Sequence, residues 1–537
     1  MPRPSSAAWT LRALAYTFFA LAVFAVAGPM QANAQEPTRL AVGTTADVVN
    51  LNPLVGNSRS DTWVTNLMYP RLMQMSASGQ KEPYVATDWG YSDDGLTAWM
   101  ELRDDMMWSD GEPFTADDVA FTITAVTEEA IGITAGLVGG SFERARAVSP
   151  TRVEFDLTQR DGQFLTNMGF WMPIVPEHVF PEVGQVSEFA NDSDWVSAGP
   201  FVMTSVERGQ RYVLEAVETY PFAPGGRAAV DEVVFRVFPD VNAQALALRA
   251  GDLDLIANAI PPAIARALSA DPSITLVEIP ALGWAHMQYN LERPPLDDLA
   301  VRQALAHAVD YEAIRRIALQ GQAGSTLSSV ISPVLSFWHD DTIEEYTYDP
   351  ERARALLEAA GYADADGDGF YDGITFGLLY DQAAAEIANW AQIVRDSSAE
   401  AGIEIELTGL ERNTYRARAR DRDHDIYAGS WSIMEEPAAY LDLAFRDGGF
   451  INYGNVSDPE IERLLDEAQA ATSPEEALGP VQAIARRINE QVYDNVLYYQ
   501  EFQFAYNSDR WEGFVPQPSD LLSLVNPLSL ASVHPVD

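Results

Sequence analysis

Apolar and polar residues alternate along several short stretches of the N-terminal half, as they do in half-buried strands. In the clearest stretch, residues 96–102, every second position is apolar. It follows a tight turn at 93–95, so the two predict the second strand of a hairpin. Farther on, Thr115 is a good helix N-cap. Apolar spacing at 61–75 predicts another helix, which Pro70 kinks or shortens. Further strands are predicted at 38–45, 151–157, 210–217 and 230–238.

From about residue 284 the apolar residues instead recur at helical spacing, as at 301–309. Asp349 before Pro350 predicts an N-cap followed by proline at the first helical position. A capping-box pattern at 473–476 opens a long helix. Helices alternate with short apolar strands, the order typical of an α/β lobe. These strands are predicted at 375–380, 403–407 and 425–430.

The length of 537 residues exceeds one ordinary domain and predicts two or three packed lobes. The chain contains no cysteine, which excludes disulfides, thiolate metal sites and cysteine nucleophiles. Its net charge of −45 repels nucleic acid and anionic lipid. We therefore interpret the acidic surface as a solvated coat and expect no nucleic-acid partner.

The N-terminus has the features of a targeting segment. Arg3 and Arg12 flank or precede an apolar stretch at 13–27 that is short for a transmembrane helix. The small residues at 32–34 fit a cleavage site. We predict a signal peptide at 1–34, cleaved near Ala34, and export to a periplasm. A membrane anchor is the alternative interpretation of the same segment.

Several enzyme classes lack their required residues. Lys81 is the only lysine and follows no glycine-rich loop, so the chain has no Walker A ATPase site. The pattern S-x-x-K at 78–81 lacks the K-T-G partner of penicillin-interacting enzymes, which needs a second lysine. No H-E-x-x-H zinc motif and no G-x-S-x-G elbow occur. A secreted glycosidase or peptidase-like hydrolase using two cleft carboxylates remains the alternative function.

The segment 88–122 closely resembles the signature of one family, the large family 5 solute-binding proteins of peptide- and nickel-type ABC importers. In that family a helix begins at the Pro-Phe-Thr-Ala-Asp-Asp-Val run, which stands here at 113–119. Further blocks resemble the family in the same order along nearly the whole mature chain. They lie at 198–201, 241–255, 301–310 and 348–362.

This resemblance implies an α/β, two-lobed periplasmic-binding-protein-like fold of the large class, with mixed sheets and a hinge of two crossover strands. The crossings are expected near 279–291 and 497–507. The expected parts are lobe I at 35–283 with an extra subdomain at about 75–197, lobe II at 284–501, and a C-terminal return to lobe I at 502–537.

The resemblance also implies a function without catalysis. The protein is expected to capture a peptide or similar polar solute between its lobes, without a cofactor. It is then expected to deliver the solute, as a monomer, to the permease and ATPase subunits of an importer.

The best local candidate for ligand binding is the loop at 427–440. In peptide-binding relatives the comparable loop holds an aspartate before proline that pairs with the peptide's amino group. Here Glu436 precedes Pro437, which keeps the acid but lengthens its reach. We predict ligand contacts for Trp431, Glu435 and Glu436. The alternative is that the two glutamates are simply solvated.

A second group of candidates lies at the first expected crossover, where the family places a strand ending in asparagine beside the cleft. It consists of Trp284, Tyr289 and Asn290. The alternative is core packing of a central strand. Three further aromatic residues are weaker candidates, which we interpret as core residues: Trp171, Trp338 and Tyr380.

An acidic loop at 364–372 has the spacing of a calcium loop, with glycine at its sixth position. The predicted ligands are Asp364, Asp366, Asp368 and Asp372. The twelfth position is Thr375, where a calcium loop has a bidentate glutamate. The ligand set for a structural calcium ion is therefore incomplete, and a plain acidic turn is the alternative.

Overall fold

The computed structural model describes residues 37–56, 58–76, 78–321, 328–431, 436–519 and 521–536. The predicted signal peptide and its cleavage site lie outside these residues. From Thr38 onward the chain forms one compact unit. Among the described helices, none combines the length and the apolar character needed to cross a membrane.

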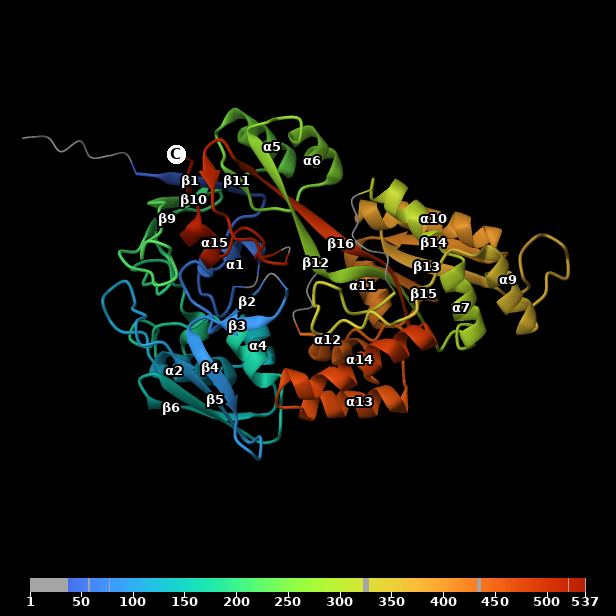
Figure 1. The fold of residues 1–537 in the computed structure, drawn as a ribbon, viewed down its shortest axis with the longest axis horizontal. Helices are drawn as coiled ribbons and strands as arrows, with labels where there is room; N and C mark the ends of the chain where they lie inside the picture. Colours follow the sequence, from blue (N-terminus) through green and yellow to red (C-terminus); the bar gives the residue numbers. More distant parts are fainter. Residues whose placement is uncertain are drawn as a thin grey trace, which may run out of the picture. The chain divides into compact units, whose positions relative to one another are not determined.

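The dominant element of the described chain is a mixed sheet of ten strands (Figure 1). Parallel pairs, such as β1 with β10 and β13 with β14, occur beside antiparallel ones. The strands in spatial order are β14 (Glu404–Leu410), β13 (Thr375–Asp381), β15 (Ile426–Ser430), β12 (Ile274–Tyr289), β16 (Asp494–Asn507), β11 (Leu255–Ile256), β1 (Arg39–Thr44), β10 (Glu232–Val237), β9 (Arg211–Ala216) and β8 (Phe201–Glu207).

Two long antiparallel strands, β12 and β16, lie side by side at the centre of this sheet. On its other side β12 pairs with β15, whereas β16 pairs with β11, so both strands connect the two ends of the sheet. Their register shifts between Pro280 and Trp284 and again between Ala285 and His286. Strand β16 contains the stretch predicted as a crossover at 497–507, and β12 covers the predicted stretch 279–291 as far as Tyr289. The exact lobe limits stay a prediction, because the sheet is continuous across them.

A smaller sheet of four described strands carries the segment with the strongest family signature. As predicted, a turn with Gly95 in the left-handed region (φ 72°) precedes a strand whose residues alternate between half-buried and buried. Thr115 caps the following helix and shares a capping box with Asp118. The strands are β4 (Ala86–Tyr91), β5 (Thr97–Leu102), β7 (Arg152–Leu157) and β6 (Phe142–Ser149).

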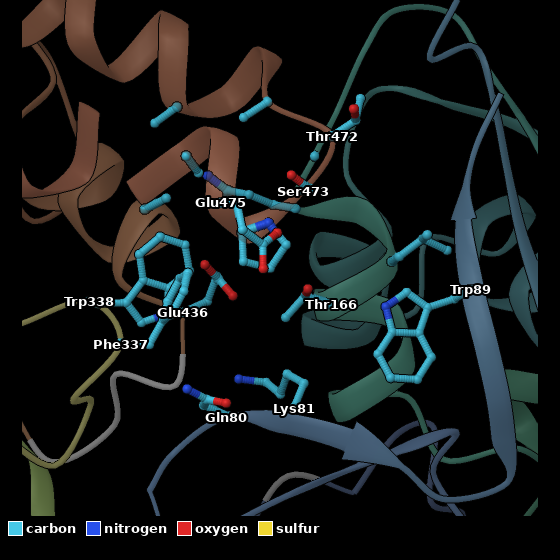
Figure 2. Close-up of a pocket in the computed structure, with 18 of the residues that line it drawn as sticks. Gln80, Lys81, Trp89, Thr166, Phe337, Trp338, Glu436, Thr472, Ser473 and Glu475 are labelled. Atoms are coloured by element: carbon cyan, nitrogen blue, oxygen red, sulfur yellow. The ribbon is translucent and has the colours of Figure 1, made fainter. Parts of the chain in front are cut away.

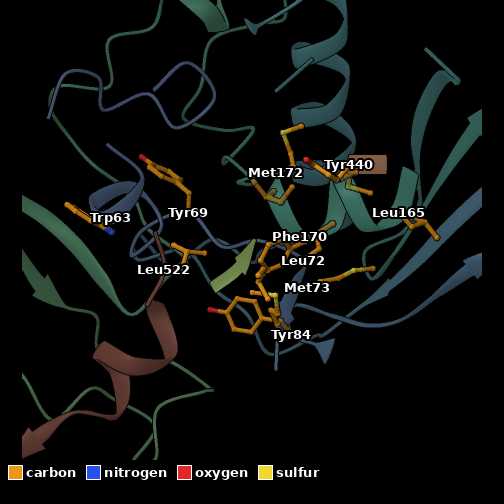
Figure 3. Packing of buried hydrophobic residues seen from close by; sticks show 14 of the residues in the cluster. Trp63, Tyr69, Leu72, Met73, Tyr84, Leu165, Phe170, Met172, Tyr440 and Leu522 are labelled. Carbon is orange, nitrogen blue, oxygen red and sulfur yellow. The ribbon is translucent and has the colours of Figure 1, made fainter. Parts of the chain in front are cut away.

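The helix predicted at 61–75 is wrong over most of its length. Helix α1 (Arg59–Thr65) ends five residues before Pro70, and β2 (Met73–Met75) pairs instead with β3 (Lys81–Pro83). The residue before a proline is disfavoured in helices. The apolar spacing arises because a turn and a strand bury their side chains in the same core. Figure 3 shows Leu72 and Met73 packed beside Phe170 in that core.

The predicted helices of the C-terminal half are confirmed, and their caps explain where they begin. Asp349 accepts a hydrogen bond from the Arg352 amide, and Ser473 accepts one from the Glu476 amide. The Glu476 carboxylate, however, accepts from the Thr472 amide, one residue before the position expected in a capping box.

The remaining described helices are α2 (Ala116–Glu128), α3 (Gly132–Val138), α4 (Phe164–Trp171), α5 (Val241–Ala250), α6 (Pro262–Leu268), α7 (Leu299–His307), α8 (Tyr311–Ala313), α9 (Pro350–Ala359), α10 (Ala385–Glu400), α11 (Arg412–Arg420), α12 (Pro437–Phe445), α13 (Pro459–Ala470), α14 (Pro474–Gln491) and α15 (Pro527–Ser532). Short 3₁₀ and π turns occur at Val186–Glu188 and Ile314–Ala318, and a two-stranded ribbon pairs β17 (Trp511–Glu512) with β18 (His534–Pro535).

Candidate functional site

Two cavities lie where N-terminal segments meet the helices α12 to α14. The first, of about 340 Å³, is bounded by the β2–β3 hairpin, β4 and the start of α4 on one side. Its other side consists of Phe337, Trp338 and the N-terminal ends of α12 and α14 (Figure 2). The second cavity, of about 540 Å³, lies between α1, the start of α3, the end of α4 and helix α12. Both volumes lie in the range typical of small-molecule sites.

Glu436 lines both cavities, so they adjoin at this residue. The backbone places it there because Glu436 is the N-cap of α12 and Pro437 begins the helix. Figure 2 shows the Glu436 carboxylate and the Lys81 amine facing each other across the first cavity. Burial raises the pKa of Glu436, and the nearby Lys81 charge opposes part of this increase.

Aromatic rings supply much of the cavity wall. Trp89 and Trp338 line the first cavity, and Trp171 lines the second. The Arg71 guanidinium carbon lies 5.1 Å from the Trp171 ring centroid, so the arginine is stacked at the edge of the second cavity. The site therefore combines flat apolar surfaces with a few charged groups, as ligand-binding clefts do.

The two sides of the first cavity touch directly at its rim. The Gly162 amide donates a hydrogen bond of 3.0 Å to the Gln469 carbonyl oxygen at the end of α13. A Cβ atom on Gly162 would lie only 1.4 Å from the carbonyl oxygen of Ala471. This approach is possible only for glycine, and it brings the segment before α4 against the loop between α13 and α14.

Of the predicted loop residues, Glu436 lines the cavities, whereas Glu435 lies outside the described residues. Trp431 is half-buried at the end of β15. Its ring centroid lies 5.8 Å from that of Tyr440, which itself lines the second cavity. Trp431 is therefore one aromatic layer behind the cavity surface.

The three candidates at the crossover occupy the core. Trp284 is fully buried and packs edge-on against Tyr440 at 5.1 Å. The Tyr289 hydroxyl accepts a hydrogen bond from Asn495. The Asn290 side-chain amide donates to the carbonyl oxygens of Arg422 and His424. None of the three is in either cavity lining, so their contact with ligand stays a prediction.

Sequence reasoning missed several lining residues. In the sequence, Lys81 was used only to exclude enzyme classes. That it is the sole lysine could have singled it out as a candidate site residue, and it lines the first cavity. Arg71 and Phe337 carried no sequence signal. Two aromatics interpreted as core, Trp338 and Trp171, line the first and second cavity respectively. Tyr380 lies in β13, outside both linings.

The acidic loop forms an exposed turn at the far end of α9. One carboxylate oxygen from each of Asp364, Asp366 and Asp368 lies within 4.8 Å of the others. Asp364 also accepts hydrogen bonds from the Gly367 and Gly369 amides, and Asp372 accepts one from Ala365. Because these carboxylates already stabilise the turn, its geometry fits an acidic turn as well as a calcium loop. Calcium binding stays a prediction.

Comparison with known proteins identifies relatives of this arrangement. Residues 80–452 match the model of bacterial extracellular solute-binding proteins, family 5 middle region. The dipeptide-binding protein of Escherichia coli (strain K12) is 28% identical over 386 residues, covering 68% of this chain and 70% of that one. Heme-binding protein A of Haemophilus influenzae is 28% identical over 433 residues, with 76% and 77% covered.

Solved structures confirm the predicted two-lobed fold. The substrate-binding protein CtaP from Listeria monocytogenes superposes with a TM-score of 0.82 at 22% identity, covering 94% of this chain and all of that one. The oligopeptide-binding protein AppA from Bacillus subtilis, solved with a nonapeptide, gives 0.69 at 24% identity, with 94% and 100% covered. By the family match over most of its length, the chain belongs to the bacterial extracellular solute-binding proteins of family 5.

Proposed function

We propose that this protein is the exported, periplasmic substrate-binding component of an ABC importer and captures a short peptide or similar polar solute. The family membership supports the role, and the names of its relatives support the ligand class. Relatives are also named for heme and nickel, so the family alone does not decide the ligand. The chemistry of the cavities must decide it.

The observation that carries the proposal is the position of Glu436. It is the carboxylate common to both cavities, and the Lys81 charge lies near it. Its pKa is raised because burial disfavours the charged form. An ammonium group of a ligand would compensate the Glu436 carboxylate for the water that it loses on burial. The ion pair would orient the ligand more than it would add net affinity.

The two lobes are expected to close because a bound ligand contacts both walls of the first cavity. The β2–β3 hairpin and α4 form one wall of the first cavity, whereas α12 and α14 form the other. A solute between them adds favourable contacts only when the walls are together, so it shifts the population toward the closed state. We propose that β12 and β16 act as the hinge and that the permease recognises the closed form.

This proposal differs from the hydrolase alternative in what happens to the ligand. The relatives reported above are named as binding proteins, which favours capture without chemical change. Isothermal titration with a panel of di- and tripeptides, followed by mass spectrometry of the recovered peptide, separates the two functions. We expect stoichiometric binding and an intact peptide. Cleavage products that increase with time would overturn the proposal.

Small-angle scattering tests the mechanism in the same samples. We expect the radius of gyration to fall when a binding peptide is added in excess. An unchanged scattering curve at saturation would contradict closure.

A further inference from the structure

The second cavity presents a more apolar surface than the first. Five aliphatic or aromatic side chains from distant segments line it: Leu54, Trp171, Tyr440, Leu443 and Leu521. The charged side chains among its described lining residues are Glu436, which also lines the first cavity, and Arg71, which is stacked on Trp171. The first cavity has polar side chains such as Gln80 and Ser473 on its wall, besides three charged ones (Figure 2).

Three threonines in the lining of the second cavity direct their hydroxyl hydrogens to the backbone. Thr62 and Thr65 each donate to the main-chain carbonyl oxygen four residues earlier. Thr134 donates to the carbonyl oxygen of Ile131. These hydroxyls therefore have no hydrogen left to donate to a solute. An apolar group needs no such donor, and its transfer from water into the cavity is favourable.

The second cavity is large enough for more than one aromatic ring. Its volume is about 540 Å³, whereas an apolar cavity of about 150 Å³ already holds benzene. Trp171 lines it from the end of α4, and Tyr440 lines it from α12. An aromatic group in the cavity can therefore pack against rings from both walls, in the stacked or edge-on arrangements that aromatic pairs prefer.

The wall of the second cavity also contains a glycine within a helix. Gly136 lies in α3, although glycine is among the least favourable residues inside a helix. A Cβ atom at this position would meet no atom within 4 Å. No neighbouring atom requires a glycine here, so its effect is to leave space in the cavity that a larger side chain would occupy.

We propose that the second cavity holds an aromatic group of the solute while the polar part lies in the first cavity, and that Gly136 sets the size of the aromatic group that is accepted. This inference rests on the proposed function and specifies its ligand. The solute is a short peptide, or a compound of similar size, with a large aromatic side chain. Solutes with only small side chains leave the apolar wall in contact with water and bind more weakly.

Titration calorimetry with matched dipeptides tests this selectivity. Alanylalanine is compared with four dipeptides in which phenylalanine or tryptophan replaces either alanine. We expect the best aromatic dipeptide to bind at least about 10-fold more tightly than alanylalanine, since it buries a large apolar side chain. Its heat-capacity change should also be more negative, as apolar burial requires. Equal or weaker binding of all four would overturn the inference, while leaving the proposed peptide capture intact.

A cavity-filling variant assigns the effect to the second cavity. We expect Gly136→Leu to weaken binding of the aromatic dipeptide about 10-fold or more and to leave binding of alanylalanine almost unchanged. Its melting temperature should not fall, because leucine is the better helix former. Gly140→Leu is the matched control, since a Cβ at Gly140 also meets nothing within 4 Å and the residue lines neither cavity.

A second variant removes apolar surface from the opposite wall. Leu443 is 47% exposed, so Leu443→Ala should not destabilise the fold, and we expect it to weaken only the aromatic dipeptide. Equal losses for both peptides in Gly136→Leu would show general damage to the site and refute the size limit. An aromatic preference unchanged in both variants would place the aromatic group elsewhere. If no peptide binds the wild type at all, the proposed function itself fails, and this inference fails with it.

Discussion

Replacing Gly162 by alanine tests whether the contact at the cavity rim belongs to the closed state. The added Cβ would lie 1.4 Å from the Ala471 carbonyl oxygen, whereas ordinary van der Waals contact begins at 3.4 Å. The segment before α4 and the loop after α13 must therefore separate by about 2 Å. This separation also breaks the 3.0 Å hydrogen bond from Gly162 to Gln469.

The size of the effect follows from these two losses. Forcing an extra methyl group into a tight contact costs about 1–3 kcal/mol, within which a lost hydrogen bond accounts for about 1 kcal/mol. If the contact forms only when the walls close, this cost weakens ligand binding about 5- to 150-fold. The backbone at Gly162 is not in the left-handed region, so alanine adds no backbone strain there and should not lower the stability of the open protein.

Two measurements check this reasoning. Calorimetry should give a weaker Kd for Gly162→Ala, and scattering should give a larger radius of gyration than for the wild type at saturating ligand. Gly140→Ala is the matched control, because a Cβ there meets nothing within 4 Å. An unchanged Kd would refute a closure contact. A melting temperature lowered by several degrees without ligand would show instead that the contact belongs to the stable fold.

Three further predictions concern charged groups. Affinity for an ammonium ligand should fall as the pH drops through the raised pKa of Glu436, above 4.5, and calorimetry should find this dependence absent in Glu436→Gln. Burial lowers the pKa of His424 to about 4, so the stability linked to its neutral form is complete above pH 6.5 and declines below it. The loss should be about 2 kcal/mol at pH 5, and His424→Asn should remove it in urea titrations; an equal loss in the variant would contradict this. Asp494→Asn should destabilise the protein by about 1–3 kcal/mol, because the fully buried Asp494 carboxylate is hydrogen-bonded to His286 at 2.6 Å and to Gln288 at 3.1 Å, which joins β12 to β16; a change below about 0.5 kcal/mol in the same titration would contradict it.

Local signals in the sequence predicted the elements well where one physical rule dominated. Thr115, Asp349 and Ser473 are caps whose side chains accept the expected amide hydrogen bonds. The apolar periodicity at 61–75 wrongly predicted one helix. A short helix, a turn and a strand there all bury apolar side chains in the same core. The pairing of β12 with β16 joins residues more than 200 positions apart, and only the family resemblance indicated it.

The site was less predictable for a related reason. The acid before Pro437 was recognisable from a local motif, and it lies in both cavities. Lys81 and Trp338 line the first cavity from distant segments, and no pattern in the sequence shows that they meet. Conversely, Trp284 and Asn290 have the composition of a binding surface but are buried, because aromatic and amide side chains serve equally well inside a central strand.

The position of β16 has a consequence for how the molecule is made. This strand lies near the C-terminus, yet it occupies the middle of the sheet between β12 and β11. During synthesis, the backbone N–H and C=O groups along one edge of β12 and of β11 have no strand to pair with until almost the entire polypeptide has emerged. The native sheet therefore assembles late, through contacts of long sequence separation, which fold slowly. Such a delay leaves the strand groups on either side of β16 unjoined until the end of synthesis, even where each group has already formed its own pairs.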